Sequence, residues 1–226
     1  RIDEARAAGI DVTMAQYPYT AGSTFLHVVI PPWYHSRGVD GLLRALREER
    51  GAIKHDLDTR MDWENFSQSV GWEKIFVSSV VSEANQPCVG KSISQIAAER
   101  GHADPADAAF DLLVEEQLAV GMISFGLDEA DITAIMRHPA VSFITDGLMS
   151  GRPHPRAYAT YPRILGRYVR EQGVLSLEEA VRKMTSLPAR KIRLRNKGVI
   201  AEGYDADQSS RSRILFREPC MPGQAR

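Results

Sequence analysis

The 226-residue sequence has few features that mark a specialised class of protein. Its two cysteines, Cys88 and Cys220, are far apart and form no Cys-x-x-Cys pair, so neither a disulfide framework nor a thiolate zinc site is indicated. No apolar run approaches the roughly 18 residues of a membrane helix, and the polar start, Arg1–Arg6, lacks the apolar region of a signal peptide. A formal net charge of −1 gives no general attraction for nucleic acid or an anionic membrane. We therefore expect a cytoplasmic protein with no nucleic-acid or membrane partner.

Several catalytic motifs are also missing. The sequence contains no Walker motif, no dinucleotide-binding glycine fingerprint and no Gly-x-Ser-x-Gly elbow. Its six histidines show no His-x-His and no i, i+4 spacing, so none forms a self-contained metal site: His27, His35, His55, His102, His138 and His154. His154 lies between Pro153 and Pro155, close to the candidate site at Asp146 described below, and is able to contribute to that site.

What the sequence does contain is an alternation of strands and helices. Strands are predicted over Asp11–Tyr19, Met122–Phe125 and the run that precedes Asp146. Helices are predicted after a Ser92/Gln95 capping box, after Asp104-Pro105 and after Asp128, and further helices over 157–172, from Ser176 and from Pro188. Short connections between these elements favour parallel α/β units. Residues 30–90 fit this alternation less well, and we interpret them as a lid or a small inserted subdomain.

The stretch VSFITDG, residues 141–147, carries the strongest functional signal. A short apolar strand ends in Asp146-Gly147, and α/β barrels place catalytic groups at the carboxyl ends of core strands. A carboxylate there is able to bind a metal or accept a proton. An Asp before Gly is also common as a simple turn residue, and the spacing alone leaves both interpretations open.

Three further residues are candidates for substrate binding. Arg156 follows Asp146 in the same loop and has the geometry to bind a carboxylate with two hydrogen bonds, or merely to pair with an acid at the surface. Tyr17 and Ser23 lie in YPYTAGST, at the end of the first predicted strand. Their hydroxyls are able to hydrogen-bond a substrate carbonyl or carboxylate, or to serve only the packing of a turn.

The two ends of the sequence suggest a piece of a longer protein. Arg1 lies inside an expected helix and is not preceded by Met. After Asp207, a segment that promises a strand turns polar and basic, and we expect this tail to be loosely ordered, as after a frame change.

Several motifs follow one another in a characteristic order along the chain. They are YPYTAGST, the following Pro-Pro-Trp, SFGLDEADI, and ITDG…HPR…TYPRILGRYVRE…LEEAVRKMTSLPA…KGVIAEGYDAD. Together they resemble N-acyl-D-amino-acid deacylases (D-aminoacylases) of the amidohydrolase superfamily. The resemblance covers about residues 1–207 and corresponds to the carboxyl-terminal half of such an enzyme.

The resemblance implies a fold, an activity and a site. The fold is α/β, a partial (β/α)8 TIM-like barrel of the metal-dependent hydrolase type, with a small inserted subdomain and the start of a β-sandwich return. We expect barrel segments at 1–29 and 91–195, the insert at 30–90, and the β-sandwich return with the tail at 196–226. The implied activity is zinc-dependent hydrolysis of N-acyl-D-amino acids. Asp146 is implied as metal ligand and proton shuttle, Arg156 as the residue that binds the substrate's α-carboxylate, and Tyr17 and Ser23 as further substrate contacts.

The sequence also departs from the family. The His-x-His, the metal-binding Cys and the mid-barrel His ligands belong upstream of Arg1, and Cys88 does not match the family's Cys. Two alternatives therefore stay open. Instead of an N-acyl-D-amino-acid deacylase, the chain would then be a catalytically inactive fragment that lacks most metal ligands, or part of a hydrolase of cyclic amides of the hydantoinase or dihydroorotase type.

Overall fold

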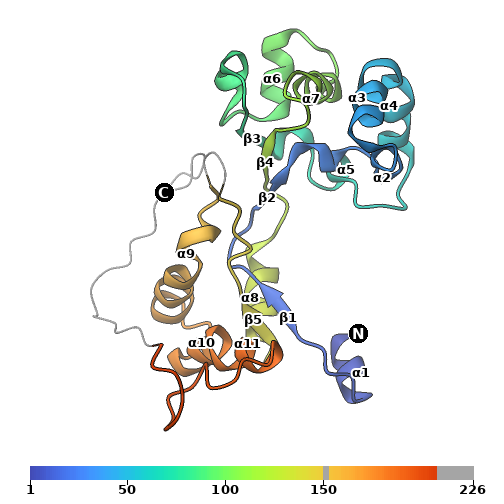
Figure 1. Cartoon of the computed structure of the whole chain (residues 1–226). Helices are drawn as coiled ribbons and strands as arrows, with labels where there is room; N and C mark the ends of the chain where they lie inside the picture. The colour runs from blue at the N-terminus through green and yellow to red at the C-terminus, as the bar shows by residue number, and fades with distance from the viewer. Residues whose placement is uncertain (150–152, 208–226) are drawn as a thin grey trace. The chain divides into compact units, whose positions relative to one another are not determined.

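The computed structural model describes residues 1–149 and 153–207, which form two compact units (Figure 1). Unit 1 comprises residues 1–19, 128–147 and the described residues from Pro155 onward. Unit 2 comprises residues 20–127 together with the described residues between Leu148 and His154. Unit 2 is thus inserted in the chain between two parts of unit 1.

Unit 1 is built on two short parallel strands. Strand β1 (Met14–Gln16) pairs with β5 (Val141–Phe143), with Met14 opposite Val141. The helical elements of this unit are α1 (Ile2–Ala7), α8 (Glu129–Arg137), α9 (Arg156–Arg163), the π-helical segment η4 (Ile164–Glu171), α10 (Leu177–Met184) and α11 (Ser186–Lys191). Apolar side chains from α8, β5, η4 and α10 form its core. The parallel pairing of the strand that leads to Asp146 confirms the α/β expectation for this part of the chain.

The helices of unit 1 begin where the sequence places capping residues. The Asp128 side chain accepts a hydrogen bond from the N–H of Ala130 at 2.6 Å. The Ser176 hydroxyl accepts one from the N–H of Glu179 at 3.2 Å. Each cap satisfies a backbone donor that the first helical turn leaves unpaired. Both predicted helix starts are confirmed.

Unit 2 contains a three-stranded antiparallel sheet. Its strands are β2 (Gly22–Phe25), β3 (Ile75–Ser79) and β4 (Gly121–Ser124), and β4 lies between the other two. The helices are η1 (Leu26–Val29), α2 (Pro32–His35), α3 (Gly38–Glu48), α4 (Arg50–Thr59), α5 (Phe66–Ser69), η2 (Trp72–Lys74), η3 (Glu83–Cys88), α6 (Ile93–Arg100) and α7 (Pro105–Glu115). The predicted Ser92/Gln95 capping box begins α6, and the predicted Asp104-Pro105 start begins α7.

The structure corrects the predicted environment of β4. We expected this strand to continue a parallel α/β series into the strand before Asp146, but it pairs antiparallel with β2 and β3 in the other unit. Helices α6 and α7 lie in that unit too, so the units do not follow the segment boundaries expected at residues 29 and 90. An apolar run of four residues is typical of any buried central strand, and it contains no information about the partner or its direction.

A hydrogen bond joins the two ends of the main segment of unit 2, residues 20–127. The N–H of Leu127 donates to the carbonyl oxygen of Thr20 at 3.1 Å, beyond the β2–β4 pair. This segment therefore begins and ends at neighbouring positions.

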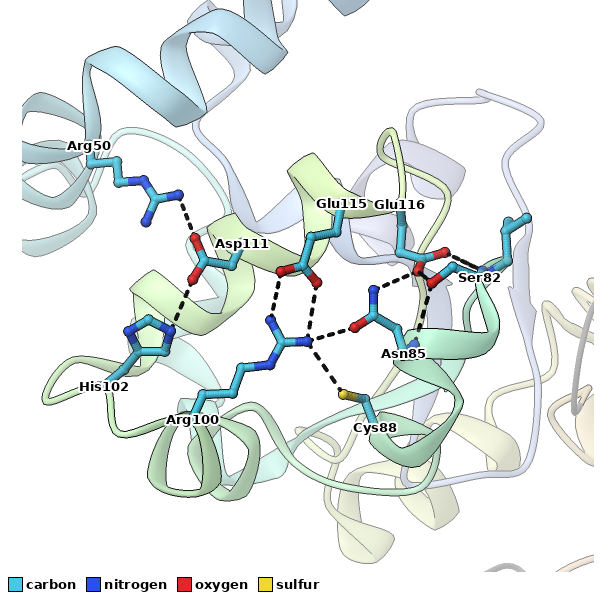
Figure 2. Close-up of polar contacts among 10 residues, drawn as sticks. Arg50, Ser82, Asn85, Cys88, Arg100, His102, Asp111, Glu115 and Glu116 are labelled. Carbon is cyan, nitrogen blue, oxygen red and sulfur yellow. Dashed lines mark hydrogen bonds and ion pairs between the residues drawn. The ribbon is translucent and has the colours of Figure 1, made fainter.

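A buried carboxylate organises the polar contacts of unit 2 (Figure 2). Glu116, only 4% exposed, accepts hydrogen bonds from the N–H groups of Val81 and Ser82, the Ser82 hydroxyl and the Asn85 amide. Burial alone would raise the pKa of Glu116, but these hydrogen bonds outweigh it and lower the pKa from 4.5 to about 2. The Asn85 side chain in turn accepts from Arg100 at 2.6 Å. Glu116 thus connects α7 to the loop between β3 and η3.

Residues 199–207 differ from the expectation of a strand. They form turns and irregular backbone, and Lys197 pairs with Asp205 at 2.9 Å. A strand is stable only against a partner, and no described strand lies next to this segment. The polar tail, residues 208–226, lies outside the described residues. Within residues 1–149 and 153–207, no helix combines the length and apolar composition needed to cross a membrane.

Candidate functional site

Asp146 follows directly from the parallel strand pair of unit 1. The N–H of Ile144 donates to the carbonyl oxygen of Gln16 at 3.0 Å, which continues the β1–β5 pairing one residue beyond β5. Two residues later Asp146 adopts a left-handed backbone conformation, with φ of 46°, and its side chain is 56% exposed. Asp tolerates this conformation better than most residues, so the turn suits the residue type. The carboxylate is therefore presented to solvent at the carboxyl end of a parallel strand.

Arg156 and Tyr17 lie next to this carboxylate. Arg156 is the first residue of α9 and is buried, with 3% of its side chain exposed. Its Nη2 lies 3.0 Å from Oδ2 of Asp146, and its Cζ lies 4.6 Å from the centre of the Tyr17 ring. An arginine held over an aromatic face is stabilised in its charged form and fixed in orientation. The structure thus brings three of the four predicted site residues together.

A second arginine supports the loop that carries Tyr17, and the sequence analysis did not identify it. Arg163 donates from Nε to the carbonyl oxygen of Pro18 at 2.7 Å, and its Cζ lies 4.8 Å from the centre of the Tyr19 ring. The Tyr168 hydroxyl donates to Glu129 at 2.9 Å. Burial, opposed by Arg163 and assisted by Glu129, raises the pKa of Tyr168 to about 12. The signal in the sequence was an Arg and a Tyr on the otherwise apolar face of the helix in TYPRILGRYVRE.

Ser23 and His154 belong to unit 2. Ser23 lies on β2, where it faces Ile123 of β4 in the strand register. His154 is buried, with 2% exposed. The role of Ser23 in substrate binding stays a prediction, as does a contribution of His154 to the site.

The residues of the site do not form a complete metal centre by themselves. No group of three or more His, Cys, Asp or Glu side chains with metal-binding geometry occurs in the part of the chain that the structure describes. A catalytic zinc takes about three protein ligands, and Asp146 supplies one carboxylate.

Comparison with known proteins identifies the family. Residues 85–208, more than half of the chain, match the model of the Amidohydrolase family. The chain belongs to the amidohydrolase family. This segment includes Asp146, Arg156, Arg163 and Tyr168.

Individual amidohydrolases match almost the whole chain. It is 36% identical to an N-acyl-D-glutamate deacylase and 33% identical to a D-aminoacylase, both of Alcaligenes xylosoxydans xylosoxydans, over 91% and 90% of its length. Among solved structures, N-acyl-D-glutamate deacylase from Bordetella bronchiseptica, complexed with zinc and a phosphonate inhibitor, covers 91% of the chain with a TM-score of 0.65 and 31% identity. The chain spans about a third of the length of these amidohydrolases, 33% and 34% respectively.

Proposed function

We propose that this amidohydrolase chain is part of an enzyme that hydrolyses N-acyl-D-amino acids to a carboxylate and a D-amino acid. One observation carries the proposal: a buried arginine, Arg156, lies beside an acid at the end of a parallel strand, Asp146. A guanidinium recognises a carboxylate such as that of an amino acid, and the acid is able to transfer protons at a neighbouring amide. The similarity to N-acyl-D-glutamate deacylase and D-aminoacylase over nine tenths of the chain supports this substrate class.

We further propose that unit 1 is part of a (β/α)8 barrel and unit 2 an insert in it. The parallel β1–β5 pair, with helix α8 before β5 and helix α9 after it, is typical of such a barrel. Two strands cannot close a barrel, so the remaining strands belong to residues outside this chain.

The roles of the residues follow from their chemistry. Asp146 accepts a proton from the attacking water and returns it to the departing amine nitrogen. Arg156 binds the α-carboxylate, with Tyr17 fixing the guanidinium plane and contributing a hydroxyl to the substrate. The hydroxyl contact that the family resemblance implies for Ser23 stays a prediction. A zinc ion, when bound, supplies Lewis acidity to the reaction. Asp146 is the ligand this chain would offer, and the other ligands would come from residues outside it.

The proposal is tested by assaying the full-length protein on matched substrates. We expect release of the free amino acid from N-acetyl-D-glutamate or N-acetyl-D-leucine, and little from the corresponding L-compounds. Ring opening of a hydantoin at a comparable rate would instead support the cyclic-amide alternative. Turnover of none of these compounds by zinc-loaded, folded protein would contradict the proposal and support an inactive protein.

Arg156 gives a more specific test. We expect Arg156→Met to raise KM for an N-acyl-D-amino acid about ten- to a hundredfold, because a hydrogen bond to a charged group contributes about 1.5–3 kcal/mol. The measurement compares this substrate with an N-acyl amine that has the same acyl group and no carboxylate. The variant should lose more activity on the substrate that has the carboxylate than on the N-acyl amine, because the ion pair with Asp146 is lost for both compounds. An equal loss on both compounds would contradict the assigned role and indicate that the site itself had changed shape.

A further inference from the structure

Unit 2 contains a cavity of about 400 Å³ that two histidines line. His27 lies in η1 and His35 is the last residue of α2. Apolar walls come from Phe25, Val39 and Leu42. A cavity of this size with converging polar groups is typical of a ligand site. His27 and His35 are eight residues apart, a spacing that does not predict a contact. The turn between η1 and α2 brings their rings together.

The two imidazole rings have the separation expected for a shared ion. Their centroids lie 5.5 Å apart and their planes are inclined by 56°. Metal–nitrogen bonds of about 2.0–2.1 Å place the centroids of two tetrahedrally bound imidazoles roughly 5 Å apart. His27 is also held by stacking on Phe25, at 5.7 Å with an interplanar angle of 10°. The separation of the rings is therefore compatible with one shared ion.

The hydrogen bonds of the two rings leave one nitrogen on each for a metal. Nε2 of His35 lies 3.1 Å from the carbonyl oxygen of Ile30, which only accepts, so Nε2 has the proton and Nδ1 of the neutral ring has the lone pair. Metal-binding histidines commonly donate their second N–H to a backbone carbonyl in this way. Nδ1 of His27 is buried and makes no hydrogen bond in the described structure.

Part of the cavity lining has an unusual backbone conformation. Gln117 and Leu118, which both line it, have φ of 50° and 69°. Two consecutive residues with side chains in the left-handed region are uncommon, and such strain is concentrated at ligand sites.

We propose that His27 and His35 form a binding site for Zn²⁺ in unit 2, with Nδ1 of each ring as a ligand. No third His, Cys, Asp or Glu completes a cluster in the described residues, so water or a small anion fills the remaining positions. The site is open and its affinity is lower than that of a four-ligand structural zinc. The proposal does not depend on the proposed amidohydrolase activity.

The test is a titration of the chain, labelled with ¹⁵N-histidine, with ZnCl₂. We expect the Nδ1 resonances of His27 and His35 to shift together while Nε2 of His35 stays protonated. The exposed His55 on α4 should not respond. This measurement needs no variant, so it does not depend on the folding of a mutant. Shifts at other histidines without His27 and His35, or no shifts at all, would overturn the proposal.

Calorimetry provides the matched comparison. His27→Gln and His35→Gln should each weaken Zn²⁺ binding at least about tenfold, the effect of losing some 1.4 kcal/mol. His55→Gln, which removes an exposed histidine of α4, should leave this binding unchanged. Retention of the wild-type affinity in both His27→Gln and His35→Gln would refute the site.

Discussion

Asp146→Asn is expected to lower kcat for N-acyl-D-amino acids by about 10²- to 10⁴-fold in the full-length enzyme, the usual contribution of a positioned acid–base group. Asn has nearly the same shape as Asp but cannot accept and return a proton. It also tolerates the left-handed backbone conformation of this residue, with φ of 46°, as well as Asp does. Ala would add backbone strain to the loss of the carboxylate. The Asn variant therefore isolates the chemistry from the fold.

The control removes an acid of the same type from the same unit. Asp131→Asn, on the exposed side of α8, changes the net charge equally and touches none of the site residues. It should leave kcat within about twofold of the wild type, as surface substitutions usually do. Initial rates at saturating substrate measure the effect. A kcat for Asp146→Asn within a few-fold of the wild-type value would remove Asp146 from the proposed mechanism.

The second large effect is on stability. Glu116→Gln is expected to lower the free energy of unfolding of unit 2 by about 3 kcal/mol, the value of a pKa shift from 4.5 to about 2. The amide of Gln would turn donor atoms toward N–H and O–H groups that need an acceptor. Urea denaturation followed by tryptophan fluorescence reports on this unit alone, because Trp33, Trp63 and Trp72 all lie in it.

The stabilising contribution of Glu116 should depend on pH. The pKa of Glu116 is lower in the folded state, so its contribution is present above about pH 4.5 and is lost as the pH falls toward 2. The difference between the wild type and Glu116→Gln should shrink by more than half between about pH 6 and pH 3. Glu115→Gln is the matched control. It removes the adjacent acid on α7, which forms an ion pair with Arg100 and whose side chain is 45% exposed. This variant should lower the free energy of unfolding by less than about 1 kcal/mol. A pH-independent difference, or equal losses in the two variants, would contradict this account.

Local features of the fold were predictable from the sequence. The caps at Ser92, Asp104, Asp128 and Ser176 follow from residues within one turn of each helix. The parallel strand before Asp146 was predicted, and the proximity of Arg156 to Asp146 followed from their shared loop. Tyr17 was selected as a site residue by its motif and by resemblance to a family, not by any spacing to Asp146.

The rest depends on contacts between distant segments. The sequence of β4 gives no indication that its partners are β2 and β3. The hydrogen bond from Arg163 to Pro18 and the ring contact between His27 and His35 also depend on tertiary packing. The types of these residues and their spacing in the sequence do not predict such contacts. The same holds for Glu116, whose four hydrogen bonds come from the segment between Val81 and Asn85.

The hydrogen bond between Leu127 and Thr20 has a consequence for the order of folding. Residues 20–127 leave the ribosome before β5 is synthesised, and they contain their own core, so they are able to fold first. Once they have done so, a long flexible loop no longer separates β1 from β5, and most of the entropy of closing it has already been lost. Formation of the β1–β5 pair, which has the largest sequence separation among the described strand pairs, thereby becomes a nearly local event.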